Sequence, residues 1–481
     1  MDKIDKSITW LANSSYRAIS SKKARKYILG FFIVQAIIVA LSVRIGYPPD
    51  ELFHIRFIEY LASHGADPFT GTQTGGFHLG DVSRTPEYLY QYVMGLLYRI
   101  IPFGVYGTYL SFRFVSIALS AATLLMLAKL GDKLKIPTSV TNVVLLLLAN
   151  SAQFLFLSAS VNSDLLVWFL VVVSVLLLVN YLNNSSLQKL FILAGIVALG
   201  MVTKRTYMPV GFFVAVAAAV KSFMIRKQLF EQLKRPDAYL LASVMFFVLG
   251  FGLFSERVGV NLAKYQQIKP ACLDLHTEQQ CIQNGVERRN LKIRQAKIVD
   301  IYDYGLLEYG FGWSYLTVEK LVGTQGWTGS AVAPPVLSVV VLGMSTAGLA
   351  GSALELKANK KDRNEIVRLA LYVGSLVFII YNFWFNYQVY HRSGIPALAL
   401  QGRYVLPTAT IFLLISGFYV YKHIITTTVA RRIVAAALIL FVLSSSGLNL
   451  ILASNKYTDN VFKPWIIYNR DQFLSEHEPS I

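Results

Sequence analysis

Charge is scarce in this sequence. Only 15% of the 481 residues are Asp, Glu, Lys or Arg, whereas 54% are hydrophobic, and the mean hydropathy is +0.49. A water-soluble chain of this length needs many more charged residues to cover the surfaces of its domains. The composition therefore argues against an ordinary soluble enzyme and favours a protein whose solvent is largely lipid.

Acidic residues are the scarcer kind. The chain has 27 acidic and 45 basic residues, which gives a formal net charge of +18. In a soluble protein such an excess would indicate nucleic-acid binding. Here the basic residues stand in short runs between apolar segments, as they do in the cytoplasmic loops of membrane proteins. Nucleic acid is therefore not an expected partner.

Several catalytic motifs are also absent. The sequence has no glycine-rich phosphate loop, no nucleophile elbow and no zinc-protease helix. It also lacks an internal repeat of about 20–50 residues. Phosphate binding would have to rest on Lys and Arg, and we expect no metal ion or other cofactor.

Cysteine is nearly absent, because the chain has only Cys272 and Cys281. They lie in a long polar segment, and two thiols so close in sequence can form a disulfide if that segment is outside the cytoplasm. The single His276 between them does not complete a zinc site.

Long apolar runs dominate what the sequence does contain. About eleven of them are candidate membrane spans. They cover residues 27–44, 107–129, 138–157, 163–182, 190–203, 207–222, 238–254, 333–353, 369–388, 404–421 and 433–452. The fifth and sixth are short and meet at Thr203–Pro209, which predicts a hairpin that dips into the membrane. The pattern indicates an all-α polytopic membrane protein.

Basic runs predict the orientation of these spans. The runs fall on one side if the spans alternate, and they are Lys22–Lys26, Lys129–Lys135, Lys221–Arg235, Lys357–Arg363 and Ala430–Arg432. Positive loops mark the cytoplasmic side, so the N-terminus is predicted inside and the C-terminus outside. Residues 1–26 would form a basic cytoplasmic segment, residues 27–452 the transmembrane domain, and residues 453–481 a short external tail.

Two large segments, residues 45–106 and 255–332, then lie outside. The first contains Asp50–Gly65, where apolar and charged residues are interleaved, and the Tyr-rich stretch Glu87–Pro102. Both stretches are predicted to be helices that lie in the membrane interface rather than cross it.

Acids and bases gather at the outer ends of the predicted spans. They are Asp50, Glu51, Arg84, Glu87, Arg113, Asp164, Lys204, Arg205, His391, Arg392 and Arg403. Ionisable residues at membrane depth are costly and commonly mark functional sites. Bases can hold an anionic phosphate, and an acid can take a proton from an attacking hydroxyl.

Structural roles for these residues remain open alternatives. Asp50 and Asp164 each precede or open a helical pattern and could simply cap it. Arg113, near a span end, could extend to lipid headgroups. Lys204 and Arg205 are harder to explain structurally, because two bases at an outer turn oppose the positive-inside bias.

Several strings resemble a known family. An external Pro-Pro-Asp-Glu string after the first span, at Pro48–Glu51, is similar to the opening of GT-C membrane glycosyltransferases. Further similar strings are Phe112–Leu134, Val161–Leu182, Leu199–Pro209, Tyr309–Leu316 and Gln401–Pro407. They most resemble a bacterial branch of the family. The resemblance spans about residues 27–421 and rests on the order and shared external placement of the strings.

This resemblance implies a hexosyl- or pentosyltransferase, expected to act with inversion. It would take a sugar from a polyprenyl-phosphate donor, such as undecaprenyl phosphate. The acceptor would be a cell-surface glycan or lipid, for example O-antigen or lipopolysaccharide, on the periplasmic face of a bacterial cytoplasmic membrane. The family's general base maps onto Asp50, with Glu51 as its unresolved neighbour, and a second acid maps onto Asp164.

Other candidates complete the predicted site. Lys204, Arg205, Arg403 and Arg113 are expected to hold the donor phosphate, and the substrate would be lined by Arg84, Glu87, His391, Arg392 and Tyr404. A transporter or flippase of a lipid-linked saccharide is the alternative function. It would need polar residues throughout the bundle, whereas the ionisable groups here gather on one face.

Overall fold

The computed structural model describes residues 2–43, 45–46, 48, 50–63, 84–101, 104–234, 236–283, 288, 304–325, 331–332, 335–357, 362–395, 400–444, 447–448 and 451. The predicted external tail, residues 453–481, lies outside these ranges, as do parts of both predicted external segments.

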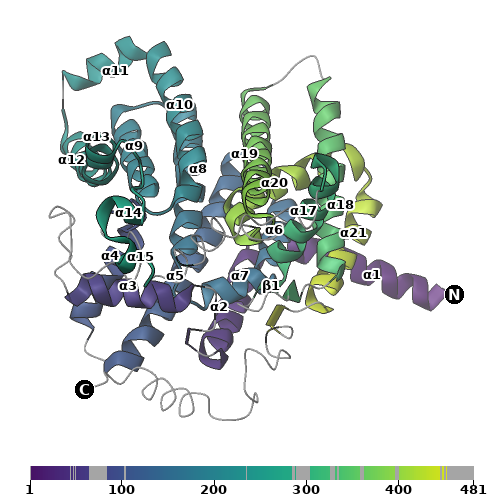
Figure 1. Cartoon of the computed structure of the whole chain (residues 1–481). Coiled ribbons are helices and arrows are strands. Elements are labelled where there is room, and N and C mark those ends of the chain that lie inside the picture. The colour runs from purple at the N-terminus through teal and green to yellow at the C-terminus, as the bar shows by residue number, and fades with distance from the viewer. Residues whose placement is uncertain are drawn as a thin grey trace.

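Helices make up nearly all of the described structure (Figure 1). The first part of the chain forms α1 (Asp2–Ile19), α2 (Ala24–Ser42), α3 (Glu51–Ser63), α4 (Leu89–Ile100), α5 (Gly104–Lys133), α6 (Thr138–Ala149), α7 (Ala152–Ser158), α8 (Ser163–Asn183), α9 (Leu187–Met201), η2 (Arg205–Tyr207) and α10 (Met208–Met224). The remainder forms α11 (Arg226–Leu233), α12 (Ala238–Phe254), η3 (Ser255–Gly259), α13 (Val260–Tyr265), α14 (Cys272–Leu275), α15 (Glu278–Cys281), α17 (Leu306–Val322), β1 (Thr324–Gln325), β2 (Ala331–Val332), α18 (Pro335–Leu356), α19 (Arg363–Ser393), α20 (Gly402–Tyr419), η4 (Val420–Ile424) and α21 (Thr428–Ser444). The prediction of an all-α fold is confirmed, and β1 and β2 form only a short antiparallel pair.

Eight helical stretches in the described ranges are long and apolar enough to cross a membrane. They are Ala24–Ser42, Gly107–Lys133, Ser163–Asn183, Arg205–Met224, Ala238–Tyr265, Leu337–Leu356, Arg363–Ser393 and Gly402–Ile424. A ninth would consist of α6 and α7, which meet at an angle of 68°. That bend falls where Ser151 accepts a hydrogen bond from the backbone N–H of Phe154, so a new helix cap interrupts the apolar run.

The predicted fifth and sixth spans differ from each other. The fifth is the short helix α9, of 15 residues, as expected. The sixth is longer than expected, because η2 and α10 continue as one stretch of 20 residues, Arg205–Met224. The predicted eleventh span is represented by α21, of 17 residues, and its remaining residues fall mostly outside the described ranges.

The core is centred on α8 and α20, which are the most buried of the long helices. The indole N–H of Trp168 on α8 donates to Thr410 Oγ1 on α20 at 3.1 Å. The Trp168 ring packs edge-on against Phe154 of α7, which in turn stacks on Phe32 of α2. These apolar contacts fix the relative positions of the helix ends that carry the candidate site.

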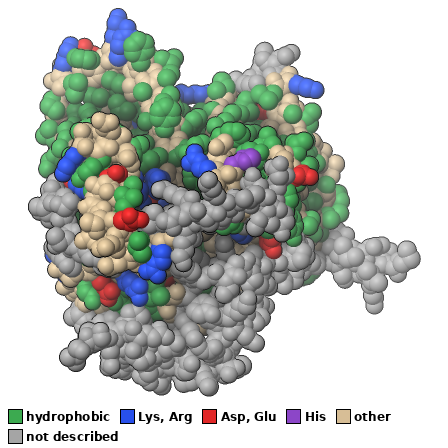
Figure 2. All heavy atoms as spheres, viewed as in Figure 1, with side chains coloured by type: hydrophobic (Ala, Val, Ile, Leu, Met, Phe, Trp, Pro, Cys, Tyr) green, Lys and Arg blue, Asp and Glu red, His purple; other side chains and the backbone are tan. Residues whose placement is uncertain are grey.

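The outer surface of the bundle is apolar on its sides. On α12 the side chains of Tyr239 and Met245 are 81% and 72% exposed, which suits a surface in contact with lipid. Figure 2 shows hydrophobic side chains over this flank, with Lys and Arg gathered over α11 at one end. The basic segment around α11 is therefore at the opposite end of the molecule from α3 (Figure 1).

The two predicted interfacial helices are α3 and α4, and they pack on each other at that opposite end. In Figure 1 α3 lies across the direction of α8 and α10. Arg99 of α4 donates from Nε and Nη2 to the carbonyl of Ala62 at 2.8 and 2.6 Å, which satisfies the C-terminus of α3. Ile58 and Met94 lie in the apolar contact between the two helices and α5.

The segment that follows α12 covers part of the same end. Cys272 and Cys281 are joined by a disulfide that links α14 and α15. Arg84 donates to Glu256 Oε1 at 2.6 Å and to Asn261 Oδ1 at 2.9 Å, so it ties the start of the α4 segment to η3 and α13.

Candidate active site

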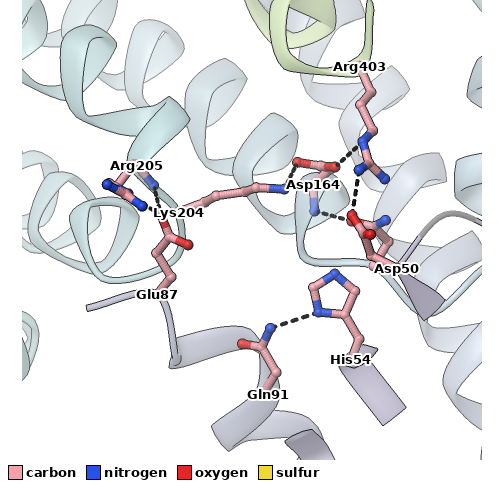
Figure 3. Close-up of polar contacts among 9 residues, drawn as sticks. Asp50, His54, Glu87, Gln91, Asp164, Lys204, Arg205 and Arg403 are labelled. Carbon is pink, nitrogen blue, oxygen red and sulfur yellow. Dashed lines mark hydrogen bonds and ion pairs between the residues drawn. The ribbon is translucent and has the colours of Figure 1, made fainter. Parts of the chain in front are cut away.

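Four charged side chains from separate segments meet near α3 (Figure 3). Arg403, at the start of α20, donates from Nη2 to Asp50 Oδ2 at 2.5 Å, and its Nε lies 3.5 Å from Asp164 Oδ2. Lys204, just before η2, donates from Nζ to Asp164 Oδ1 at 2.5 Å. Asp50, Arg403, Asp164 and Lys204 thus form one continuous network, which we call the charged cluster.

Local structure explains how Arg403 enters the charged cluster. It follows Gly402, where a Cβ atom would lie 2.4 Å from the backbone carbon of Lys320. Only glycine permits this approach of α20 to the end of α17. Lys320 also donates from Nζ to the carbonyl of Leu400 at 2.9 Å, which holds the chain just before Arg403.

Asp164 is free to face the two cations because another residue caps α8. The side chain of Asn162 accepts a hydrogen bond from the backbone N–H of Asp164 at 2.9 Å. Asn162 is therefore the cap, and the Asp164 carboxylate binds Lys204 and Arg403 instead. With 6% exposure, Asp164 lies beneath the surface of the charged cluster.

Asp50 is the exposed acid of the charged cluster, because its side chain is 42% accessible. Its backbone occupies the cap position of α3, since its carbonyl accepts from the N–H of His54 at 2.9 Å. The residue has a φ of 63°, an unfavourable left-handed conformation for a residue with a side chain, costing roughly 1 kcal/mol. The carboxylate points to Arg403 (Figure 3). Asp50 can therefore cap α3 through its backbone and belong to the charged cluster through its side chain.

The charges around Asp50 keep it ionised. Burial disfavours the carboxylate, but Arg403, followed by protonated His54 and Lys204, outweighs burial, so the pKa of Asp50 lies below its usual value of 3.8. Burial also disfavours the charged form of Lys204, yet the Asp164 carboxylate raises the pKa of this lysine above 10.5. Both groups are therefore charged at neutral pH.

Glu51 lies in a different environment from Asp50. Its carboxylate accepts from Arg113 Nε at 2.9 Å and Nη2 at 2.7 Å, and both side chains are fully buried. It also accepts from the backbone N–H groups of Gly46 at 2.7 Å and Val161 at 2.9 Å. Glu51 and Arg113 are thus separate from the charged cluster. They form a buried ion pair that connects α3, α5 and the turn before α8.

Three further predicted residues, Arg205, Glu87 and Tyr404, flank the charged cluster. Arg205 donates from its backbone N–H and its Nε to Glu87 Oε1 at 3.1 and 3.0 Å. Burial disfavours ionised Glu87, but Lys269 and Arg205 outweigh it, so its pKa is lowered. The ring of Tyr404 faces Lys204 and Arg403, with their charged groups 5.1 and 5.4 Å from its centre.

The other predicted residues lie elsewhere. Arg84 is held by Glu256 and Asn261, as described above. His391 and Arg392 are exposed at the end of α19, where the His391 ring packs on Tyr387 at 4.4 Å. Among the residues that the structure describes, no three His, Cys, Asp or Glu side chains are placed to hold a metal ion.

Two residues near the charged cluster were not predicted. His54 is one helical turn after Asp50, and its Nδ1 lies 2.8 Å from Gln91 Nε2 on α4. The spacing of four residues from Asp50 could have placed His54 on the same helix face. Nothing in the sequence pattern indicated Gln91 as its partner.

An apolar groove begins just below the charged cluster, on the same helices. It has a volume of about 620 Å³ and lies between α8, α10, α19 and α20. Its lining includes Val171, Pro209 and Thr408, which follow Asp164, Lys204 and Arg403 by five to seven residues. At a rise of about 1.5 Å per residue, the groove starts roughly 7–10 Å from the charges. Phe212 and Val377 in its wall are 68% and 59% exposed, so it opens on the apolar flank.

Comparisons with known proteins give similarity at the level of structure alone. No family model and no curated protein matches the chain. The structure is similar to the oligosaccharyltransferase of Archaeoglobus fulgidus in its apo form, with 13% identity and a TM-score of 0.46 over 96% of this chain. The chain spans only 59% of the length of that protein. The same archaeal enzyme, AglB, bound to an inhibitory peptide and a dolichol-phosphate, gives a TM-score of 0.43 at 13% identity, again over 96% of this chain and 59% of its own.

A bacterial structure is similar too. ArnT from Cupriavidus metallidurans gives a TM-score of 0.33 and 13% identity over 82% of this chain and 78% of its own. Both neighbours are GT-C membrane glycosyltransferases, the family that the sequence strings resemble. Scores below 0.5 carry no functional argument, so function has to be argued from the charged cluster and the groove.

Proposed function

We propose that this protein is a GT-C-type membrane glycosyltransferase that moves a sugar from a polyprenyl-phosphate donor to a glycan or lipid acceptor. The reaction would take place on the extracytoplasmic face of a bacterial cytoplasmic membrane. One observation carries the proposal: an exposed carboxylate, Asp50, shares a network with two cations directly above an apolar groove. Such a site matches the three parts of the reaction, which are an acceptor hydroxyl, an anionic leaving group and a hydrocarbon chain.

Asp50 is the proposed general base. It is more exposed than Asp164 and, unlike Glu51, its carboxylate is not enclosed by backbone and guanidinium donors. In the proposed step Asp50 takes the proton of the acceptor hydroxyl as the hydroxyl oxygen bonds to the anomeric carbon. The bond from that carbon to the phosphate oxygen breaks, and the electron pair leaves with polyprenyl phosphate. Direct displacement of this kind inverts the anomeric centre.

Lys204 and Arg403 are proposed to stabilise the departing phosphate. Positive groups placed where charge develops lower the barrier most when they are already oriented. Asp164 supplies that orientation, because its two carboxylate oxygens lie against Lys204 and Arg403. Arg205, 57% exposed beside Lys204, would add a third cation at the rim. Arg113, closed in its pair with Glu51, would support the site indirectly.

The apolar groove is proposed to hold the first isoprene units of the donor. A methylene group that leaves water gains about 0.8 kcal/mol, whereas a chain that is already in lipid gains from close packing against the groove wall. The opening of the groove on the lipid-facing flank would let the chain enter sideways from the membrane. The phosphate would then reach Lys204 and Arg403 without leaving the membrane interface.

The proposal is tested with purified protein in nanodiscs. Radiolabelled undecaprenyl-phosphate hexoses and pentoses are incubated with a panel of lipopolysaccharide, wall-polysaccharide and peptide acceptors. We expect transfer by the wild type without a second protein, no transfer by Asp50→Asn, and wild-type transfer by Glu278→Gln, an exposed acid on α15. Near-full transfer by Asp50→Asn would overturn the assignment of the base. Movement of the labelled lipid across the bilayer without transfer would favour a flippase instead.

A further inference from the structure

His54 is a buried titratable residue that the proposed reaction does not use. Only 5% of the residue is exposed, and it lies between Gln91 and the charged cluster. In Figure 3 one ring nitrogen faces Gln91 and the other points toward Asp50. Among the described residues, Gln91 is the hydrogen-bond partner of the His54 ring, and no hydrogen bond forms at the second nitrogen, Nε2.

Gln91 fixes where the imidazole carries its proton. The Gln91 amide nitrogen lies 2.8 Å from His54 Nδ1, and an amide nitrogen can only donate. With the Gln91 amide in this orientation Nδ1 accepts, and the neutral ring carries its hydrogen on Nε2. Gln91 itself is 2% exposed, so this contact is shielded from competing water. The result is a fixed N–H donor directed at the charged cluster.

The surroundings of His54 make it a weak base and favour the neutral imidazole. The charged groups acting on it are Asp50 on its own segment, Asp164 from α8, Lys204 from the segment before η2, and Arg403 from α20. Burial, which disfavours the imidazolium, is the strongest effect and lowers the pKa of His54 to about 4. At neutral pH Nδ1 is occupied by Gln91 and Nε2 already holds a proton, so neither nitrogen can take another from a substrate.

We propose that His54 Nε2–H binds a hydroxyl oxygen of the saccharide beside Asp50, and so makes His54 a specificity-determining residue. The inference rests on the proposed function and deepens it. Nε2 has no hydrogen bond to the described protein and is not sealed from solvent, so a ligand at the charged cluster can reach it and form one. A saccharide hydroxyl fits, because it accepts a hydrogen bond and is neutral. A phosphate is better matched to Lys204 and Arg403, the two cations of the charged cluster.

Deoxy sugars test the inference. Two series are compared in the transfer assay, one with single hydroxyl groups removed from the donor sugar and one with hydroxyl groups removed from the acceptor. For the wild type we expect one deoxy compound to lower kcat/KM by about tenfold or more. For His54→Leu the rate with the full sugar should fall by a similar factor, and the same deoxy compound should cause no further loss. The series that contains this compound identifies whether donor or acceptor supplies the hydroxyl.

His54→Gln serves as the matched variant, because its amide can place an N–H near the position of Nε2. We expect it to recover most of the rate and the sensitivity to the same deoxy compound. If His54→Leu keeps the wild-type sensitivity to every deoxy compound, the inference is overturned while the proposed function stands. If the wild type neither transfers sugar nor binds undecaprenyl phosphate, the proposed function fails and the inference fails with it.

Gln91→Glu tests the hydrogen-bond donor of His54 through the pH dependence of activity, which would not change if His54 only supported the fold. A carboxylate at position 91 accepts from Nδ1–H, so the neutral imidazole would lose its hydrogen at Nε2. Only the doubly protonated ring would then present the donor. The new carboxylate should raise the pKa of His54 above its wild-type value. We expect this variant to approach wild-type activity below that pKa and to lose activity as pH rises through it. A pH profile unchanged from the wild type would contradict the tautomer argument.

Discussion

Arg113 binds both carboxylate oxygens of Glu51, at 2.9 and 2.7 Å, in a pair from which solvent is fully excluded. The next residue toward the N-terminus, Asp50, binds Arg403 and is 42% exposed. Two adjacent acids therefore have opposite environments. The left-handed backbone at Asp50 turns the chain just before α3 begins, which sends one carboxylate inward and the other to the charged cluster.

The buried pair gives a first prediction about stability. Glu51→Gln leaves Arg113 buried with its charge uncompensated, and breaking a buried ion pair costs about 3–5 kcal/mol. We expect a lower yield of folded protein and a lower unfolding midpoint in detergent, measured by fluorescence-detected size-exclusion after heating. Glu278→Gln, the exposed acid on α15, should leave both quantities unchanged. An unfolding midpoint equal to that of the wild type in Glu51→Gln would contradict a structural role for this pair.

The contact between Arg403 and Asp50 gives a prediction about pH. A general base must be ionised to accept a proton, so the transfer rate falls when pH drops through its pKa. Arg403 lowers the pKa of Asp50 against the effect of burial, which keeps the carboxylate ionised in mildly acidic solution. Arg403→Gln removes the strongest of the charges that oppose burial, so the pKa of Asp50 should rise.

The measurement is the pH dependence of kcat/KM. In Arg403→Gln we expect kcat/KM to begin its fall toward acidic pH at a higher pH than in the wild type. The maximum value of kcat/KM should also be lower. Arg392→Gln, an exposed arginine at the end of α19, is the control and should keep the wild-type pH dependence. If kcat/KM of Arg403→Gln falls at the same acidic pH as that of the wild type, a group other than Asp50 controls this fall.

Lys204 gives a prediction about binding that does not require a known sugar or acceptor. Its Nζ is held at 2.5 Å from Asp164, beside the mouth of the groove. Removing a charge-assisted contact to phosphate costs about 1.5–3 kcal/mol, or about tenfold to a hundredfold in affinity. We expect this loss for undecaprenyl phosphate in Lys204→Met, measured by native mass spectrometry. Lys264→Met, an exposed lysine on α13, should bind as the wild type does, and equal affinity in both variants would exclude Lys204 from phosphate binding.

Hydropathy and charge in the sequence were enough to predict the helical bundle and to place Asp50, Asp164, Lys204 and Arg403 at one end. The structure brings these four side chains together, whereas the alternation of loops across a membrane on which the prediction relied stays a prediction. The bend between α6 and α7 was missed, because averaging hydropathy over a window conceals a single cap at Ser151. The length of the sixth span was also missed, since η2 adds polar residues that hydropathy assigns to a loop.

Partners far apart in the chain could not be predicted. Glu51 and Arg113 are separated by 62 residues, and a one-dimensional pattern does not say which of two neighbouring acids turns inward. Arg84 is likewise held by Glu256, 172 residues away. The contact of His54 with Gln91 depends on how α3 packs on α4, which follows from Ile58, Met94 and their apolar neighbours rather than from any motif.

The apolar groove gives a last prediction, about chain length. Gly374 of α19 lines the groove, and a Cβ there would approach the ring of Phe213 to 3.2 Å, so Gly374→Leu would fill space without meeting backbone. Gly252→Leu on α12 is the control, because a Cβ there meets nothing within 4 Å and both changes favour helix equally. If the groove holds the donor's first isoprene units, Gly374→Leu should lower the affinity for undecaprenyl phosphate by about tenfold, because the added side chain takes the place of chain atoms that pack against the groove wall. Inorganic phosphate, which has no chain, should bind both variants as it binds the wild type. Equal affinity of Gly374→Leu and Gly252→Leu for the long-chain lipid would place the chain outside this groove.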